Sequence, residues 1–541
     1  MNGGRQLYFS LAIAAIVILL CIFLNKISSK LGVPALLAFI SLGMLFGTDG
    51  LLKIPFDDYG FAEKICSTAL IFIMFYGGFG TNWNTAKPVA VKSLLLSSIG
   101  VIITAGLTAL FCIYFLKVKF AESCLIGALL GSTDAASVFS ILRSKRLNLK
   151  YNTASLLELE SGSNDPCAYM LTTIVISIIN GNATGSSIAY MVFSQLVYGI
   201  AFGVGIAACA VLLLKFVKFK TDGFDTIFVV AMALLAYALP SLIGGNGYLS
   251  TYIVGIVLGN SDLRNKKTLV PFFDGINGLM QMLIFFLLGL LSTPSNLLTV
   301  WFPSLLIALF MTFIARPITV FSILSPFKSN ISQQAVTSWC GLRGAASIVF
   351  AIIAITSVKT ENDIFHIIFC VVLFSILMQG SLLPFVSRKL NLIDDTFDVM
   401  KTFTDYSDEE PIQFIRFTIA EKHAWCGSSV RSILLPPDTI IVLLMRGERR
   451  IVPMGNTRLH SGDTLVLCAK SSGNVDGVNL SEKKILKGDS CIGKALSDIK
   501  SSDDGLVIII KRDKKVIIPQ GQTKIKENDI LVINHREKIY E

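Results

Sequence analysis

Residues 158–166 read Glu158-Leu159-Glu160-Ser161-Gly162-Ser163-Asn164-Asp165-Pro166, and they lie in the middle of an apolar run from about residue 153 to residue 179. A run of about twenty apolar residues is long enough to cross a bilayer, so the acidic side chains of this stretch are expected at membrane depth. Ionisable groups at that depth are costly, and they are found paired or facing water. The stretch therefore predicts a membrane-spanning helix that carries an ionic site.

The composition extends this prediction to most of the chain. The 541 residues are 53% hydrophobic and 16% charged, and the mean hydropathy is +0.67, whereas about a quarter of the residues of a soluble protein are charged. Thirteen apolar runs lie between residues 7 and 387, which predicts a polytopic α-helical membrane protein. The net charge of +10 is spread without a dense basic patch, so nucleic-acid binding is excluded.

The loops between the runs predict the orientation. With the N-terminus outside, seventeen Lys and Arg residues fall in inside loops and six in outside loops. Basic residues collect in cytoplasmic loops, so we expect a multi-pass protein of the cell membrane with the N-terminus outside and the C-terminus in the cytoplasm.

Two of the thirteen runs are interrupted near their middle, at Gly131-Ser132-Thr133-Asp134 and at Cys340-Gly341-Leu342-Arg343-Gly344. Unwound backbone is tolerated at membrane depth where it is buried in protein or lines a wet cavity. With the seventh run as a linker, each interruption lies in the fifth run of a group of six, and the groups start on opposite sides of the membrane. This predicts two inverted six-helix repeats with broken, crossing helices, the arrangement of secondary transporters. The alternative is that these glycines only permit close helix packing.

The deep acidic residues have different predicted roles. Ser161 and Asp165 lie one turn apart on one helix face, and Glu160 points about 140° away from Asp165. Desolvation disfavours a charged carboxylate and a bound cation favours it, so a proton and a cation would compete for Asp165. Glu160 is predicted to form a structural ion pair with Arg343. Arg316 either neutralises the C-terminal ends of half-helices or snorkels to the interface.

Other classes fit less well. The eleven cysteines and four histidines show no metal-ligand spacing, so no zinc site or other metal cofactor is expected. An intramembrane protease would need a base or a second aspartate paired with its nucleophile, and no such motif is present. We therefore expect a transporter rather than an enzyme. A monovalent cation channel gated by the tail is the alternative.

Three motifs in this order on a thirteen-span frame resemble the sodium-or-potassium/proton antiporters with an Asn-Asp motif: residues 131–134, 160–165 and 341–345. With its tail, the chain resembles the bacterial potassium/proton antiporters of the cell-volume-regulation type. The resemblance implies exchange of potassium, in preference to sodium, for protons without a cofactor. It also implies a homodimer, a core that moves against a dimerisation scaffold, and a role in pH and cell-volume homeostasis at the inner membrane.

The same resemblance predicts the site residues. Asp165 is the carboxylate that protons and cations share, Asn164 is its neighbour in the motif, and Ser161 and Thr133 join Asp165 as ligands of the monovalent cation. Asp134 completes the predicted cation- and proton-binding set. Glu160 and Arg343 are the ion pair that joins the sixth and twelfth spans.

The C-terminal part of the chain repeats itself at a constant offset of 66 residues, with ten identities that include Gly427 and Gly493, Arg446 and Arg512, and Asp463 and Asp529. We expect a transmembrane domain over 1–390, a linker over 391–411, and two small α/β units over 412–475 and 476–541. The first unit resembles the C-terminal domain of regulators of potassium conductance. No Gly-x-Gly-x-x-Gly motif follows a strand, so a dinucleotide is not expected. The tail is either a dimerisation module without a ligand or the site of a small-molecule or nucleotide regulator.

Overall fold

A computed structural model describes the chain in two compact units, Met1–Asp408 and Glu409–Glu541. The described residues are 2–31, 34–145, 147–182, 184–216, 223–261, 263, 266–393, 412–421, 423–436, 439–447, 449–470, 479–485, 489, 491–498, 505–512, 515–517, 519 and 521–535. The predicted linker falls almost entirely outside them, as does the predicted boundary between the two tail units.

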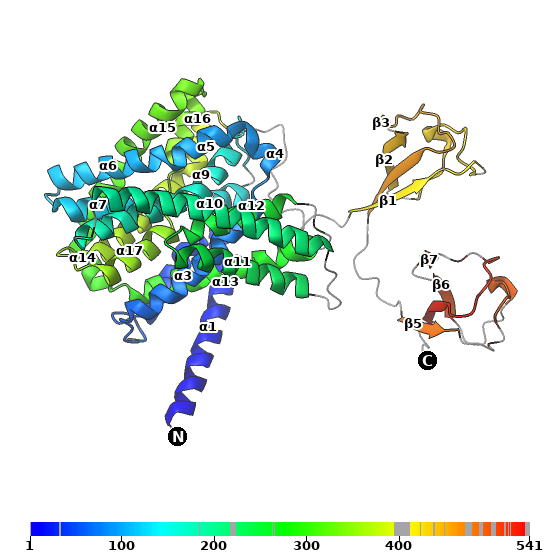
Figure 1. The fold of residues 1–541 in the computed structure, drawn as a ribbon, viewed down its shortest axis with the longest axis horizontal. Helices are drawn as coiled ribbons and strands as arrows, with labels where there is room; N and C mark the ends of the chain where they lie inside the picture. Colours follow the sequence, from blue (N-terminus) through cyan, green and yellow to red (C-terminus); the bar gives the residue numbers. More distant parts are fainter. Residues whose placement is uncertain are drawn as a thin grey trace. The chain divides into compact units, whose positions relative to one another are not determined.

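The first unit is a helical bundle (Figure 1). Its uninterrupted helices are α1 (Asn2–Leu31), α2 (Ala35–Phe46), α3 (Tyr59–Gly80), α9 (Thr153–Ile179), α10 (Gly185–Phe216), α11 (Phe224–Leu242), α12 (Gly247–Asn260) and α13 (Lys266–Leu291). Two predicted spans are broken into half-helices, which are α7 (Phe120–Leu129) with α8 (Ala135–Ser144), and α16 (Ile331–Trp339) with α17 (Ala345–Ser357).

The remaining three spans consist of helical segments that follow one another through tighter or wider turns. They are α4 (Trp83–Ala86), η1 (Lys87–Val89), α5 (Ala90–Ser97) and α6 (Ile99–Tyr114); α14 (Pro294–Phe310), η2 (Met311–Ala315), α15 (Arg316–Leu324) and η3 (Ser325–Phe327); and α18 (Ile364–Ser375), η4 (Ile376–Gly380) and α19 (Ser381–Lys389).

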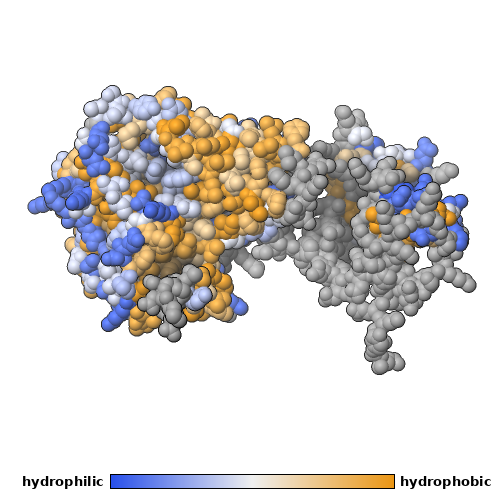
Figure 2. All heavy atoms as spheres, turned by 60° about the horizontal axis from the view of Figure 1, so that its bottom comes forward, coloured by the Kyte–Doolittle hydropathy of each residue, from blue (hydrophilic) through white to orange (hydrophobic). Residues whose placement is uncertain are grey.

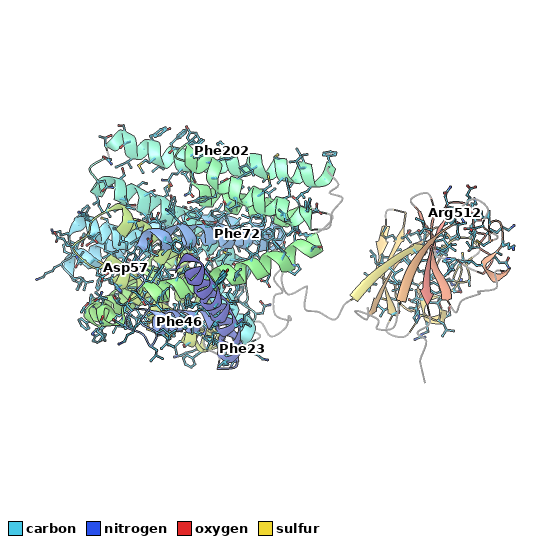
Figure 3. The ribbon with its side chains drawn as sticks, turned by 90° about the horizontal axis from the view of Figure 1, so that it is seen from below. Phe23, Phe46, Asp57, Phe72, Phe202 and Arg512 are labelled. Atoms are coloured by element: carbon cyan, nitrogen blue, oxygen red, sulfur yellow. The ribbon has the colours of Figure 1, made fainter. Side chains whose placement is uncertain are left out.

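The bundle has the surface of a membrane protein. Among the described residues, eight helices or helical segments in series are long and apolar enough to cross a membrane, and three shorter apolar helices accompany them. Figure 2 shows apolar residues over much of the flank and hydrophilic residues gathered toward one end. α10, on which Phe202 is labelled, runs along the edge of the bundle (Figure 3), and exposed apolar side chains such as Ile200 and Val204 belong to it. The predicted fold class is confirmed.

Short polar residues set several helix starts. Asp58 accepts a hydrogen bond from the Phe61 N–H at 2.8 Å before α3, and Asn330 accepts one from the Ser332 N–H at 2.8 Å before α16. These side chains satisfy backbone donors that have no partner within the helix. The breaks and turns of the bundle are therefore built by local sequence as well as by packing.

One side of the bundle is marked by the end of its last helix. Leu149, between α8 and α9, pairs with Ile393, and the Lys150 N–H donates to the Leu392 carbonyl at 2.9 Å. We call this side, where α8 and α19 end and α9 begins, the tail side, and the opposite one the far side. α9 therefore runs from the tail side to the far side.

The second unit contains two antiparallel four-stranded sheets of the same topology. The first has the order β1-β4-β2-β3 and the second β5-β8-β6-β7. The strands are β1 (Ile412–Thr418), β2 (Thr439–Arg446), β3 (Arg449–Ile451), β4 (Thr464–Lys470), β5 (Asn479–Lys484), β6 (Gly505–Arg512), β7 (Lys515–Ile517) and β8 (Ile530–His535). The helical part of each expected α/β unit is, among the described residues, a 3-10 turn, at Val430–Ser432 and at Leu496–Asp498.

The repeat at 66 residues is visible in the hydrogen bonds of the two sheets. Arg446 Nε donates to Asp463 at 2.8 Å, and Arg512 Nε donates to Asp529 at 2.7 Å; Figure 3 labels Arg512. Both carboxylates are buried. The arginine hydrogen bond holds the pKa of each carboxyl below its usual range. Each copy thus has its own ion pair between an arginine and a buried aspartate.

Candidate functional site

The two broken spans cross at their breaks. The Asp134 N–H, just before α8, donates to the Leu342 carbonyl in the other break at 2.8 Å. Gly344 packs so closely against Asp134 that a Cβ there would lie 2.5 Å from the Asp134 Cβ. A glycine is therefore required for the crossing.

A positive side chain lies at the C-terminal end of α7, and a negative side chain lies at the N-terminal end of α8. The Arg343 guanidinium donates to the carbonyls of Leu130 and Ser132 at the C-terminal end of α7, the latter at 2.8 Å. The Asp134 carboxylate accepts from the N–H and the hydroxyl of Ser137 at the start of α8. A cation at a helix C-terminus and an anion at an N-terminus both oppose the helix dipole. The cation-binding role of Asp134 stays a prediction, beside this capping role.

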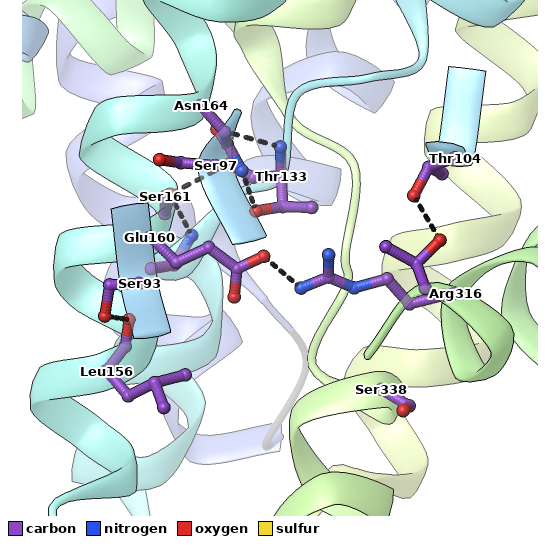
Figure 4. Close-up of polar contacts among 12 residues, drawn as sticks. Ser93, Ser97, Thr104, Thr133, Leu156, Glu160, Ser161, Asn164, Arg316 and Ser338 are labelled. Atoms are coloured by element: carbon purple, nitrogen blue, oxygen red, sulfur yellow. Dashed lines mark hydrogen bonds and ion pairs between the residues drawn. The ribbon is translucent and has the colours of Figure 1, made fainter. Parts of the chain in front are cut away.

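α9 holds the first break through two polar side chains (Figure 4). Asn164 accepts from the Thr133 N–H at 3.3 Å, and its amide donates to the Thr133 hydroxyl. Ser161 donates to the Thr133 carbonyl at 2.8 Å and accepts from the Ala135 N–H at 3.0 Å. The structure thus brings together three residues that the sequence predicted for one site, and it shows Asn164 as a clamp on the unwound backbone.

Asp165 lies beside the same break and is 6% exposed. The Ser132 hydroxyl donates to its carboxylate. Ser132 lies within the predicted break at residues 131–134 but had no predicted role. Its hydroxyl, next to Thr133 in a segment expected to be unwound at membrane depth, was the available signal.

A cavity of about 550 Å³ reaches this group. Its lining includes Ser140 in the tail-side half of α8, so it extends from the breaks toward the tail side. Four carboxylates line it and no Lys or Arg does, among the residues that the structure describes; they are Asp134, Glu158, Asp165 and Asp274. Glu158 and Asp165 are seven residues apart, so they share one face of α9 about 10 Å apart. Such a lining attracts cations.

The predicted ion pair has a different basic partner. Glu160 pairs with Arg316, not with Arg343, and both side chains are at most 4% exposed (Figure 4). The prediction was wrong because Arg343, where the breaks cross, donates to the backbone carbonyls of Leu130 and Ser132. Arg316 directly follows the wider turn η2 and lies opposite α9. Burial excludes snorkelling by Arg316. A Cβ on Gly341 would lie 2.8 Å from Arg316 Nε. The Arg316 side chain is therefore close to the C-terminal end of α16, where a positive charge would oppose the helix dipole as predicted.

The sequence matches the transmembrane sodium/hydrogen exchanger family over residues 14–389. The chain belongs to this family. The exchanger is 34% identical over 463 residues to the K(+)/H(+) antiporter NhaP2 of Shewanella sp. (strain ANA-3), an alignment that covers 84% of this chain and 80% of the relative. It is 32% identical over 465 residues to the K(+)/H(+) antiporter NhaP of Alkalimonas amylolytica, covering 85% and 81%.

The fold of this exchanger is also similar to a solved structure. The sodium proton antiporter MjNhaP1 from Methanocaldococcus jannaschii matches with a TM-score of 0.62 and 24% identity, over 71% of this chain and 99% of that one. The tail of the exchanger matches the TrkA-C domain twice, over residues 414–474 and 480–534. The antiporter resemblance drawn from the three motifs is confirmed.

Proposed function

We propose that this exchanger moves potassium across the cell membrane in exchange for protons, one for one, and that Asp165 carries either ion in turn. The observation that carries the proposal is the placement of one buried carboxylate at the inner end of an acidic cavity, beside unwound backbone. The names of the relatives at 34% and 32% identity favour potassium as the cation.

The ligands near Asp165 suit an alkali cation. Carboxylate, hydroxyl and carbonyl oxygens are hard ligands, and Asp165, the Ser161 hydroxyl and the Thr133 carbonyl supply one of each. The hydrogen bond from Ser161 to the Thr133 carbonyl is 2.8 Å long, so the two oxygens are already adjacent. We expect this bond to give way when both oxygens turn to one cation.

Exchange is obligatory because the empty site is costly to move. Without a proton or a cation, the Asp165 carboxylate is a bare charge in a buried position, and such a charge is disfavoured at membrane depth. With either ion bound, the site is neutral. A site that changes sides in its neutral forms returns one proton for each cation that it carries.

The remaining parts of the proposal concern orientation, assembly and control. The bias of basic residues supports a tail side in the cytoplasm, so the described cavity opens inward. The exchanger is proposed to act as a homodimer. The two TrkA-C units are proposed to regulate it, and deletion of the chain after Asp408 is expected to change pH or ligand dependence while the exchange reaction survives.

Proteoliposomes with a pH dye inside test the proposal. Potassium added outside is expected to drive a pH change larger than sodium drives, and choline none. A potential-sensitive dye should record no charge movement. Folded protein that gives no cation-dependent pH change, or the same change with choline, would contradict the proposal.

A further inference from the structure

Beyond Asp165 toward the far side, α9 packs against α10 and α12. Asp165 and Ala346 line the cavity. Tyr169 on α9 and Phe350 on α17 lie four residues further along their helices, about 6 Å nearer the far side. An ion that leaves Asp165 toward the far side between α9 and α12 meets the residues that fill this space.

Four aromatic rings fill it. Tyr169 contacts Tyr248 of α12 edge to face, with ring centroids 5.1 Å apart, and Phe350 at 5.7 Å. Tyr248 also contacts Tyr237 of α11 at 4.9 Å. Tyr248 and Phe350 are at most 1% exposed. Tyr169 and Tyr237 are partly buried, so the closely packed part of the cluster, which excludes water and ions, is centred on Tyr248 and Phe350.

Polar contacts join the same helices beside the rings. The Asn246 amide, at the start of α12, donates to the Pro166 carbonyl of α9 at 2.8 Å. Gln195 of α10 donates to the Thr173 hydroxyl of α9 at 2.8 Å. Pro166, Tyr169 and Thr173 follow at intervals of three and four residues, so they form one stripe of α9. This stripe faces α10 and α12.

We propose that these contacts form a far-side seal, defined as Pro166, Tyr169, Thr173 and Phe350 against Gln195, Tyr237, Asn246 and Tyr248. The seal closes the pathway while Asp165 faces the tail-side cavity, and it separates each time the site opens to the far side. The inference rests on the proposed function, because only a site that changes sides needs this contact to break. α10–α12 then form the wall against which α9 and the broken helices move.

Cross-linking across the seal tests it. Tyr169→Cys with Tyr248→Cys places one thiol on each side of the seal, and the matched control Tyr237→Cys with Tyr248→Cys places both on the wall. Each pair is built in a parent whose eleven native cysteines are replaced and which is shown to exchange. A short bifunctional thiol reagent is expected to stop exchange in the first pair, reversibly with reductant, and to leave at least half in the control.

The outcomes separate the seal from the proposed function. Undiminished exchange in the cross-linked first pair would overturn the seal while leaving antiport intact. A parent without exchange, when the native chain also has none, would count against antiport itself.

A second measurement needs no cysteine changes. Asn246→Ser keeps an oxygen that can accept from the Leu249 N–H, as Asn246 does at 3.0 Å, but lacks the amide that reaches Pro166. Loss of a hydrogen bond formed only when the seal is closed shifts the population toward the far-facing state by about fivefold. The half-saturating potassium concentration should then fall on the far side and rise on the tail side. A change in the same direction on both sides, or none, would overturn the seal.

Discussion

The two helix breaks share one sequence frame and carry opposite charges. Both read Gly-x-x-x-Ala-Ala-Ser, over residues 131–137 and 341–347. In the first, Asp134 accepts two hydrogen bonds from Ser137. In the second, Gly344 occupies the corresponding position, and the buried hydroxyl of the corresponding serine, Ser347, has no hydrogen-bond partner among the described residues.

The difference indicates a division of labour between the breaks. The first break lines the cavity with Ser132, Thr133 and Asp134, and the Ser132 hydroxyl donates to Asp165. The second keeps Arg343 enclosed, 2% exposed, and its guanidinium donates to the Leu130 and Ser132 carbonyls just past the end of α7. One break presents oxygen to an ion, and the other supplies the positive charge that holds the crossing together.

The largest expected effect is at the carboxylate beside the first break. Asp165→Asn should reduce cation-driven proton flux in proteoliposomes below detection. An amide has no negative charge to bind a cation and does not take up and release a proton as a carboxylate does. Asp274→Asn, in the mouth of the same cavity, should lower the flux by a few-fold at most. Robust flux in Asp165→Asn would contradict the assignment.

The two buried arginines should respond differently to a second change. Arg316→Ala leaves Glu160 as an unpaired buried charge, which costs about 3–5 kcal/mol, and Glu160→Gln in the same chain should recover much of the loss. Arg343→Ala should not be recovered by Glu160→Gln, since its partners are neutral carbonyls. Thermal unfolding of the four variants in detergent measures this, and equal recovery of both would refute the pairing.

A methyl group should be tolerated less in the second break than in the first. Gly344→Ala places a Cβ 2.5 Å from the Asp134 Cβ, whereas Gly131→Ala meets a Val101 methyl at 2.9 Å. We expect Gly344→Ala to lower exchange by tenfold or more, on the order of 1.4 kcal/mol in rate, and Gly131→Ala by less. Similar exchange rates for the two variants would show that the crossing adjusts more freely than its geometry indicates.

The smallest effect on exchange is expected in the tail. Asp463 and Asp529 have lowered pKa values because of their arginine partners. The stability that they contribute is therefore complete above the unfolded pKa of about 3.9 and is lost as pH falls through the lower folded value. Hydrogen exchange of β4 and β8 in the full chain should show protection near neutral pH that is lost only in stronger acid.

The repeat supplies an internal control for the tail. Arg446→Ala should reduce protection of β4 at neutral pH and leave β8 unchanged, while Arg512→Ala should do the reverse. Loss of protection in both copies from either change would mean that the two sheets unfold as one.

The sequence was sufficient for the fold class and for most of the residues that meet at the site. Apolar runs predict the spans, and the glycines with Asp134 and Arg343 predict the breaks, because these signals are local. The partner of Glu160 was missed because it depends on where a helix with a widened turn places Arg316. The residues of the far-side seal could not be predicted from the sequence either. Asn246 and the tyrosines belong to no local motif, and their contacts depend on α9 and α12 lying side by side.

The most direct test of the central claim is a count of protons released when potassium binds. Purified protein in weakly buffered detergent solution receives potassium over a series of starting pH values, with a pH indicator present. We predict that each bound cation releases about half a proton at the pH of half-protonation and close to one proton at lower pH, and that Asp165→Asn releases none. Potassium binding without proton release, or equal release from Asp165→Asn, would contradict a shared carboxylate.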